Sequence, residues 1–182
     1  IHWKSWDYLY AGKSCGGLGF KDLYCFNLAL LGKHIWRIRM FLDTLSSKIL
    51  KAKYFPNTSL SHASCGPKSL YLWKSLHQSI PLVEECLIWR VGDGTRIRIW
   101  KAKWLNRPST HMIQSPMSVL SKNSIVADLI DPHSRWWKVD LLHAIFQQED
   151  IKEIMRLPVS IFPTADKLIW KGTVNGHFSV RS

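Results

Sequence analysis

Residues 89–104 are the segment that most restricts how this chain can fold. They hold three tryptophans and five cationic side chains around the turn Gly92-Asp93-Gly94. The turn separates two runs of strand-forming residues, so the sequence predicts a β-hairpin over about 87–101. Strand alternation in the second run places its isoleucines against a core and its arginines, with Trp100, on the opposite face.

That opposite face has two interpretations. A row of guanidinium groups beside an indole can bind a phosphate backbone and stack on a base. In the other interpretation the tryptophans belong to the core and the arginines only solvate the outer face. The chemistry of the segment leaves both interpretations open.

The charge of the chain is concentrated in its N-terminal part. The formal net charge is +12; residues 1–107 carry 17 Lys/Arg against 6 Asp/Glu, and residues 108–182 carry 8 against 7. Such a concentration favours a polyanionic partner, either nucleic acid or an acidic membrane surface. No apolar run approaches the length of a membrane span and no signal pattern opens the chain. We therefore expect a nucleic-acid partner, no membrane, and an intracellular location in the nucleus or cytoplasm.

The residues that carry catalysis or bind metals form no recognisable pattern. Four cysteines, at positions 15, 25, 65 and 86, match no zinc or disulfide spacing, so we expect free, partly buried thiols. Two-metal catalysis requires clustered carboxylates, and no adjacent Asp-Asp pair occurs. Asp93 is interpreted as a turn residue that binds its own backbone. We predict no catalytic residue, no metal site and no cofactor.

Periodicity and capping residues predict the remaining elements. Helices are expected from Leu23 to Phe41 behind Asp22, from Thr44 to Pro56, from Ser69 to about Pro81, and over 136–146 and 149–157, with a short helix or strand at 125–130. Asn175-Gly176 predicts a second hairpin over about 167–181. The predicted class is α+β, mostly helical with two small hairpins.

Composition predicts three regions. Residues 1–107 form a basic helical region with the Trp-rich hairpin, 108–124 a linker rich in Pro and Ser, and 125–182 a small α+β region. Because the chain ends inside an expected strand, we expect it to be a piece of something longer.

Several stretches resemble a known family when they are taken together and in order. They are Gly16-Gly17-Leu18-Gly19-Phe20-Lys21-Asp22-Leu23, Phe26–Lys33, Trp36-Arg37, Leu50–Pro56, Trp73–Leu76, Trp89–Gly94, Ile99-Trp100, Trp104-Leu105, Asp128–Ile130, Asp166–Trp170, and Gly176–Val180 with Ser182. The chain resembles plant LINE-type (non-LTR) retrotransposon reverse transcriptase-like proteins, in the region between the polymerase core and the zinc-binding and ribonuclease H segments.

The resemblance implies that the catalytic residues lie outside this chain. The polymerase aspartates would precede it, and the zinc ligands and ribonuclease carboxylates would follow it. Residues 160–182 would be the leading edge of a truncated zinc-binding segment. Gly32, His34 and Cys86 depart from the family pattern, which fits a decaying or fragmentary copy.

We therefore expect a non-catalytic, thumb- or linker-like fragment that contacts template RNA or an RNA–DNA hybrid. The candidate contact residues are Lys33, Arg37, Arg39, Lys51, Lys53, Arg90, Arg96, Arg98, Trp100, Lys101, Lys103 and Trp104. The alternative is a structural scaffold that joins the upstream polymerase to the downstream zinc-binding and ribonuclease H domains. Such a scaffold would have no activity of its own, and this alternative includes a pseudogene-derived relic.

Overall fold

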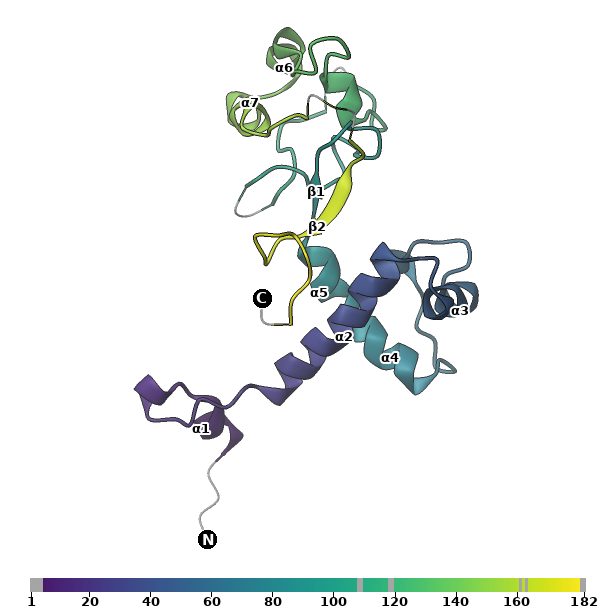
Figure 1. Ribbon diagram of the computed structural model, residues 1–182, viewed down its shortest axis with the longest axis vertical. Helices are drawn as coiled ribbons and strands as arrows, with labels where there is room; N and C mark the ends of the chain where they lie inside the picture. The colour runs from purple at the N-terminus through teal and green to yellow at the C-terminus, as the bar shows by residue number, and fades with distance from the viewer. Residues whose placement is uncertain (1–4, 108–109, 118–119, 161, 163, 181–182) are drawn as a thin grey trace. The chain divides into compact units, whose positions relative to one another are not determined.

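The chain forms two compact units. The computed structural model describes residues 5–107, 110–117, 120–160, 162 and 164–180 (Figure 1). Unit 1 comprises residues 1–85 and 178–182, and unit 2 comprises residues 86–177. Among the described residues, helices supply most of the regular structure and the sheet has two strands, in agreement with the predicted α+β class.

Unit 1 is helical. Its elements are α1 (Trp6–Tyr10), η1 (Lys13–Cys15), α2 (Leu23–Met40), α3 (Leu45–Tyr54), η2 (Leu60–His62), α4 (Tyr71–Gln78) and α5 (Ile80–Glu85). The Asp22 carboxylate accepts hydrogen bonds from the amides of Tyr24 and Cys25, at 2.8 and 3.1 Å. Thr44 caps α3 in the same way. The predicted starts of these two helices are confirmed, because a side-chain oxygen satisfies amides that have no partner inside the helix.

The helix predicted from Ser69 to Pro81 is two helices. Leu70, not Ser69, is the N-cap of α4, and Pro81 lies in the first turn of α5. A proline is tolerated there because the first amides of a helix have no intrahelical partner. The buried Ser79 separates the helices and donates its hydroxyl to the Leu76 carbonyl at 2.8 Å.

The core of unit 1 forms around Trp73, which is fully buried. The Tyr54 ring stacks on the Trp73 ring with centroids 4.4 Å apart. Trp73 Nε1 donates a hydrogen bond to the Ser64 carbonyl at 3.0 Å. The predicted apolar stripe of α2 is buried only over part of its length. Ile35 is buried, whereas Tyr24 near the start of the helix is 70% exposed.

Unit 2 is built around one pair of strands. Its elements are β1 (Leu87–Arg90), η3 (Val126–Leu129), α6 (Val139–Ile145), α7 (Gln148–Met155) and β2 (Lys167–Trp170). The strands are antiparallel, with Leu87 opposite Trp170 and Arg90 opposite Lys167. Both predicted hairpins, 87–101 and 167–181, are therefore wrong: one strand from each region pairs with the other.

A carboxylate distant in sequence explains why the first hairpin does not close. The amides of Gly92 and Gly94 donate to Asp166 Oδ1 at 2.7 and 2.9 Å, and the Arg96 amide donates to Oδ2 at 2.9 Å. A Cβ at Gly92 would collide with the Thr164 carbonyl, and Gly94 has φ of +76°. The glycines are needed for this close approach and this backbone conformation.

The second run of the predicted hairpin pairs elsewhere. The amide of Val126 donates to the Ile97 carbonyl at 2.9 Å, and the Ile99 amide donates to the Ser124 carbonyl at 3.1 Å. Ile97 and Ile99 are fully buried, so the predicted inward direction of these side chains is confirmed.

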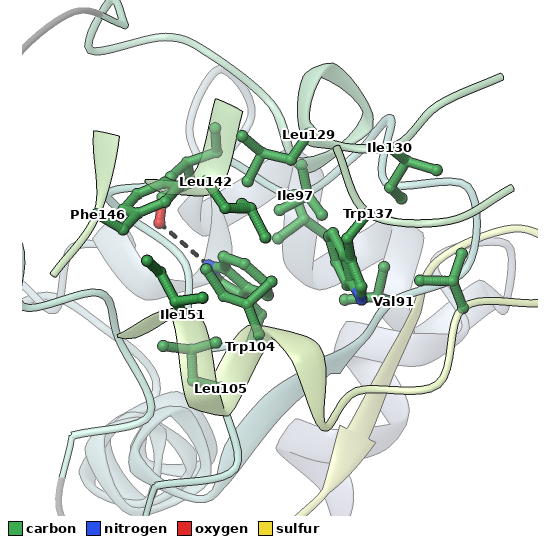
Figure 2. Packing of buried hydrophobic residues seen from close by; sticks show 14 of the residues in the cluster. Val91, Ile97, Trp104, Leu105, Leu129, Ile130, Trp137, Leu142, Phe146 and Ile151 are labelled. Carbon is green, nitrogen blue, oxygen red and sulfur yellow. Dashed lines mark hydrogen bonds between the residues drawn. The ribbon is translucent and has the colours of Figure 1, made fainter. Parts of the chain in front are cut away.

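The core of unit 2 joins this run to the helices that follow (Figure 2). Trp104 lies at its centre, with its ring centroid 6.2 Å from that of Trp137. Its Nε1 donates to the Ile99 carbonyl at 3.1 Å, so its polar atom is satisfied inside the core.

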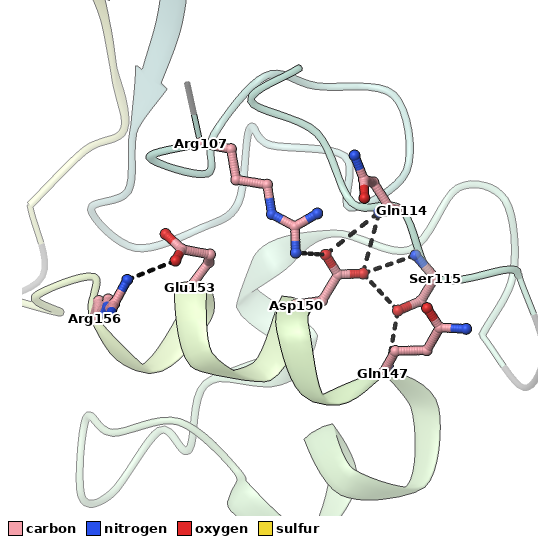
Figure 3. Close-up of polar contacts among 7 residues, drawn as sticks. All are labelled: Arg107, Gln114, Ser115, Gln147, Asp150, Glu153 and Arg156. Carbon is pink, nitrogen blue, oxygen red and sulfur yellow. Dashed lines mark hydrogen bonds and ion pairs between the residues drawn. The ribbon is translucent and has the colours of Figure 1, made fainter. Parts of the chain in front are cut away.

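The described part of the predicted linker, 110–117 and 120–124, lies inside unit 2 (Figure 3). Asp150 on α7 accepts hydrogen bonds from the amides of Gln114 and Ser115, and it forms an ion pair with Arg107 at 2.7 Å. The Ser115 hydroxyl accepts a hydrogen bond from the Gln147 amide at 2.8 Å. These hydrogen bonds hold a segment with the composition of a linker against α7, inside unit 2. The boundary between the compact units falls between residues 85 and 86 instead. Residues 108, 109, 118 and 119 lie outside the described residues.

Candidate nucleic-acid interface

The predicted contact residues are divided between the two units. Lys33 and Arg37 lie one turn apart on α2 and are exposed, as are Lys51 and Lys53 on α3. Residues four apart share a helix face. Arg39 Nη1 lies 3.9 Å from Glu84 Oε1, so a carboxylate partly offsets its charge.

Four of the predicted cations of unit 2 are exposed and have no ion pair among the described residues. They are Arg90, Arg96, Arg98 and Lys101. The loop between the first two is held by the Asp166 carboxylate, so the backbone that carries these side chains is fixed. Lys103 is half-buried, and its carbonyl accepts a hydrogen bond from the Trp89 amide at 2.7 Å.

The side chains of these cations have few polar partners. The Arg96 guanidinium lies over the Trp89 ring, 5.5 Å from its centroid. Arg98 Nη1 lies 3.5 Å from Asn123 Oδ1. Arg90 is directly opposite Lys167 in the sheet, and like charges at such positions destabilise a strand pair. In the described part of the chain the fold therefore leaves these four cations without an ion pair.

The two predicted stacking residues are placed differently from one another. Trp104 is 1% exposed, so its ring is a core element and is not available to a base. Trp100 is half-buried, with its ring centroid 5.5 Å from that of Phe146 and a buried Nε1 that has no hydrogen-bond partner among the described residues. Trp89, which is not among the predicted contact residues, is also only partly buried.

Asp93 is a turn residue, as predicted. Its Oδ1 accepts hydrogen bonds from the Thr95 amide at 3.0 Å and from the Thr95 hydroxyl at 2.8 Å. The hydrogen bond from the Thr95 amide is the main cause that lowers the pKa of Asp93. The carboxylate therefore stays ionised at neutral pH and places one negative charge among the cations of this loop.

No cluster of three or more His, Cys, Asp or Glu side chains that could hold a metal occurs in the described parts of the chain. The four cysteines, all among the described residues, form no disulfide. Cys15, Cys25 and Cys65 are exposed, so the expectation of partly buried thiols is correct only for Cys86. The Cys25 thiol donates to Asp22 Oδ2 at 3.3 Å, and this bond raises the pKa of the thiol.

Comparison with known proteins gives two plant relatives. The chain is 38% identical over 106 residues to an "Uncharacterized mitochondrial protein" of Arabidopsis thaliana. This match covers 58% of the present chain and 69% of the relative. The chain belongs to the family of this mitochondrial protein. It is also 27% identical over 188 residues to a "Putative ribonuclease H protein" of Arabidopsis thaliana. That match covers all of this chain and 30% of the relative, so the chain corresponds to less than a third of the longer protein.

The other comparisons give no match. No protein-family model and no solved structure matches the chain. Among the described helices, none is long and apolar enough to cross a membrane.

Proposed function

We propose that this chain is a non-catalytic segment of a LINE-type reverse transcriptase-like polyprotein, and that it binds template RNA or an RNA–DNA hybrid. The relation to a longer protein named for ribonuclease H supports the polyprotein context. The upstream polymerase and the downstream zinc-binding and ribonuclease H domains would be its partners in the same polypeptide. Primer-extension and hybrid-cleavage assays on the pure chain are expected to give background rates.

One observation carries the nucleic-acid proposal. Arg90, Arg96, Arg98 and Lys101 are exposed and form no ion pair with another described residue, and Asp166 holds the backbone of the turn from Gly92 to Arg96. A cation that is paired with a carboxylate must give up that ion pair to bind phosphate, which costs free energy. These four cations have no such ion pair to lose in the described part of the chain. Neutralising phosphates releases counterions, so binding is expected to weaken steeply as salt rises.

The test is a pair of double variants in unit 2 that change the charge equally. Arg96→Gln with Arg98→Gln removes two cations from the proposed interface. Lys122→Gln with Lys152→Gln removes two exposed cations outside it. RNA-binding isotherms at several salt concentrations should show that the first pair reduces the log–log salt slope by about one to two units. The control pair should leave the slope close to that of the wild-type chain, and neither should change the melting temperature.

Equal effects of the two pairs would mean that only the total charge matters, and the interface assignment would be wrong. RNA binding that does not depend on salt would also contradict it. Subcellular fractionation tests the proposed location in the nucleus or cytoplasm, with the mitochondrion as the alternative because one relative is named a mitochondrial protein.

A second function, that of a structural scaffold, is favoured by apolar side chains on unit 1. Trp6, Phe20, Leu23 and Tyr24 are between 56% and 70% exposed. Exposed apolar patches commonly mark protein–protein contacts. On this hypothesis the chain would bind no RNA at any salt concentration and would form a stoichiometric complex with the upstream polymerase region.

A further inference from the structure

Unit 2 contains a pocket that the proposed interface shares only at Arg90. Its volume is about 540 Å³, and its walls come from β1, β2, Trp104, Asn106, His111 and residues 157–160. Pockets for small ligands typically have volumes of roughly 300–1,000 Å³. All of the lining residues belong to unit 2.

Aromatic side chains form much of the wall. Trp89, Trp104 and Trp170 line the pocket. Trp104 and Trp170 are 1% and 4% exposed, so their packing holds these indoles in place. Indole surfaces favour a planar aromatic ligand, because stacking on them needs no particular hydrogen-bond pattern.

The charged side chains of the pocket are all positive. Arg90 and Lys171 line it, both are exposed, and neither forms an ion pair in the described part of the chain. No Asp or Glu is among the lining residues. Arg90 and Lys171 would therefore attract an anionic group on the ligand, and no lining carboxylate would repel it.

His111 contributes an unsatisfied polar atom. Its Nδ1 lies 2.9 Å from the Leu105 carbonyl oxygen, and because a carbonyl only accepts, Nδ1 carries the hydrogen. In the neutral ring Nε2 is then an acceptor, and it is buried without a hydrogen-bond partner among the described residues. The residue is 7% exposed and lines the pocket. Buried polar atoms are nearly always paired, so a donor on a ligand is the natural partner for this nitrogen.

We propose that this pocket binds a nucleotide. The base contacts Trp89, which is the partly exposed indole of the wall, an N–H group of the base donates to His111 Nε2, and the phosphate binds Arg90 and Lys171. The ligand is either a free mononucleotide or one nucleotide of a single-stranded RNA. The proposal stands apart from the salt-dependent binding of long RNA at Arg96 and Arg98.

The test is calorimetric titration of the whole chain with AMP, adenosine, inorganic phosphate and a short oligoadenylate. AMP is expected to bind more tightly than adenosine or phosphate alone. Lys171→Gln should weaken the binding of AMP by about tenfold, because one charge-assisted hydrogen bond is lost. The binding of adenosine should not change. Lys152→Gln is the matched control, because Lys152 is exposed in the same unit and does not line the pocket; its effect on AMP binding should be small.

A second variant tests the base contact. His111→Asn keeps a donor near the Nδ1 position and suits the observed φ of 56°, since asparagine tolerates this region, but it removes the Nε2 acceptor. It should weaken adenosine and leave phosphate unchanged. If this variant does not fold, Lys171→Gln on the surface still decides the matter.

The outcomes are distinct. Oligoadenylate binding that is tighter than AMP binding and is weakened by Lys171→Gln assigns the pocket to RNA, and weaker oligoadenylate binding assigns it to a free nucleotide. Failure of AMP to bind, or equal losses from Lys171→Gln and Lys152→Gln, overturns the proposal. Arg98→Gln alone should keep its AMP affinity, because Arg98 does not line the pocket, so the two proposals can fail separately.

Discussion

Two buried carboxylates of unit 2 each fix a loop that comes from a distant part of the sequence. Asp166 is 2% exposed and binds three amides of the 92–96 turn. Asp150 is 1% exposed and binds Arg107 together with the backbone at Gln114 and Ser115. Hydrogen-bond donors from the distant loop surround the oxygens of each carboxylate. These carboxylates determine where the candidate site residues lie.

At this scale we predict unequal effects for two ion pairs of equal length. Arg107 and Asp150 are 2.7 Å apart with side chains 11% and 2% exposed. Removing one partner of a buried pair leaves a buried charge, and Arg107→Ala should lower the free energy of unfolding by about 2–4 kcal/mol, since the backbone donors to Asp150 remain. Chemical denaturation measures the change.

Arg156→Ala is the matched control. Arg156 also lies 2.7 Å from its partner Glu153, but its side chain is 74% exposed. Exposed pairs contribute at most about 1 kcal/mol. Similar losses from the two variants would show that burial does not decide the strength of these pairs.

At the scale of elements, α2 combines a buried and an exposed half. Gly32 lies on its buried side, within a helix that packs against α5. A Cβ at this position would lie 3.4 Å from Val83 Cγ2 and 3.5 Å from Phe178 Cζ, which are ordinary contacts. The structure therefore has room for a methyl group at this position.

We predict that Gly32→Ala stabilises the chain by about 0.5–1 kcal/mol, because alanine loses less backbone entropy than glycine in a helix. Thermal unfolding followed by circular dichroism measures this. Gly17→Ala should destabilise it, since a Cβ there would collide with the Ala11 carbonyl. A lower melting temperature for Gly32→Ala would mean that the packing against α5 cannot accept the methyl group.

At the scale of the whole molecule, the charge is not distributed as the sequence halves suggest. Unit 1 has 12 Lys/Arg and 5 Asp/Glu, and unit 2 has 13 and 8, giving net charges of +7 and +5. The net charges of residues 1–107 and 108–182 differ strongly because a division at residue 107 cuts through unit 2. It separates the cations of residues 90–107 from the acidic residues that belong to the same unit.

We predict that residues 86–177 fold as an isolated fragment and that residues 108–182 do not. A cut at 107 would remove Ile97, Ile99, Trp104 and Leu105, all at most 1% exposed, from the core of unit 2. Cooperative thermal unfolding and dispersed amide resonances for 86–177 would support this. Cooperative unfolding of 108–182 would contradict it, as would a disordered 86–177.

The sequence alone determined the features that depend on near neighbours. Asp22 and Thr44 start helices because a cap bonds to amides two or three residues away. Alternation placed Ile97 and Ile99 inward because that spacing reflects the strand backbone itself.

Only the tertiary structure decided which distant groups meet. The Gly92-Asp93-Gly94 turn has the local chemistry of a hairpin, but its free amides bind Asp166, more than 70 positions later. Trp104 and Trp89 occur in one basic segment, and only the packing around Trp104 shows that it is buried while Trp89 stays partly open to a ligand. The free energy of these contacts depends on chain segments far apart in sequence, so no local pattern determines them.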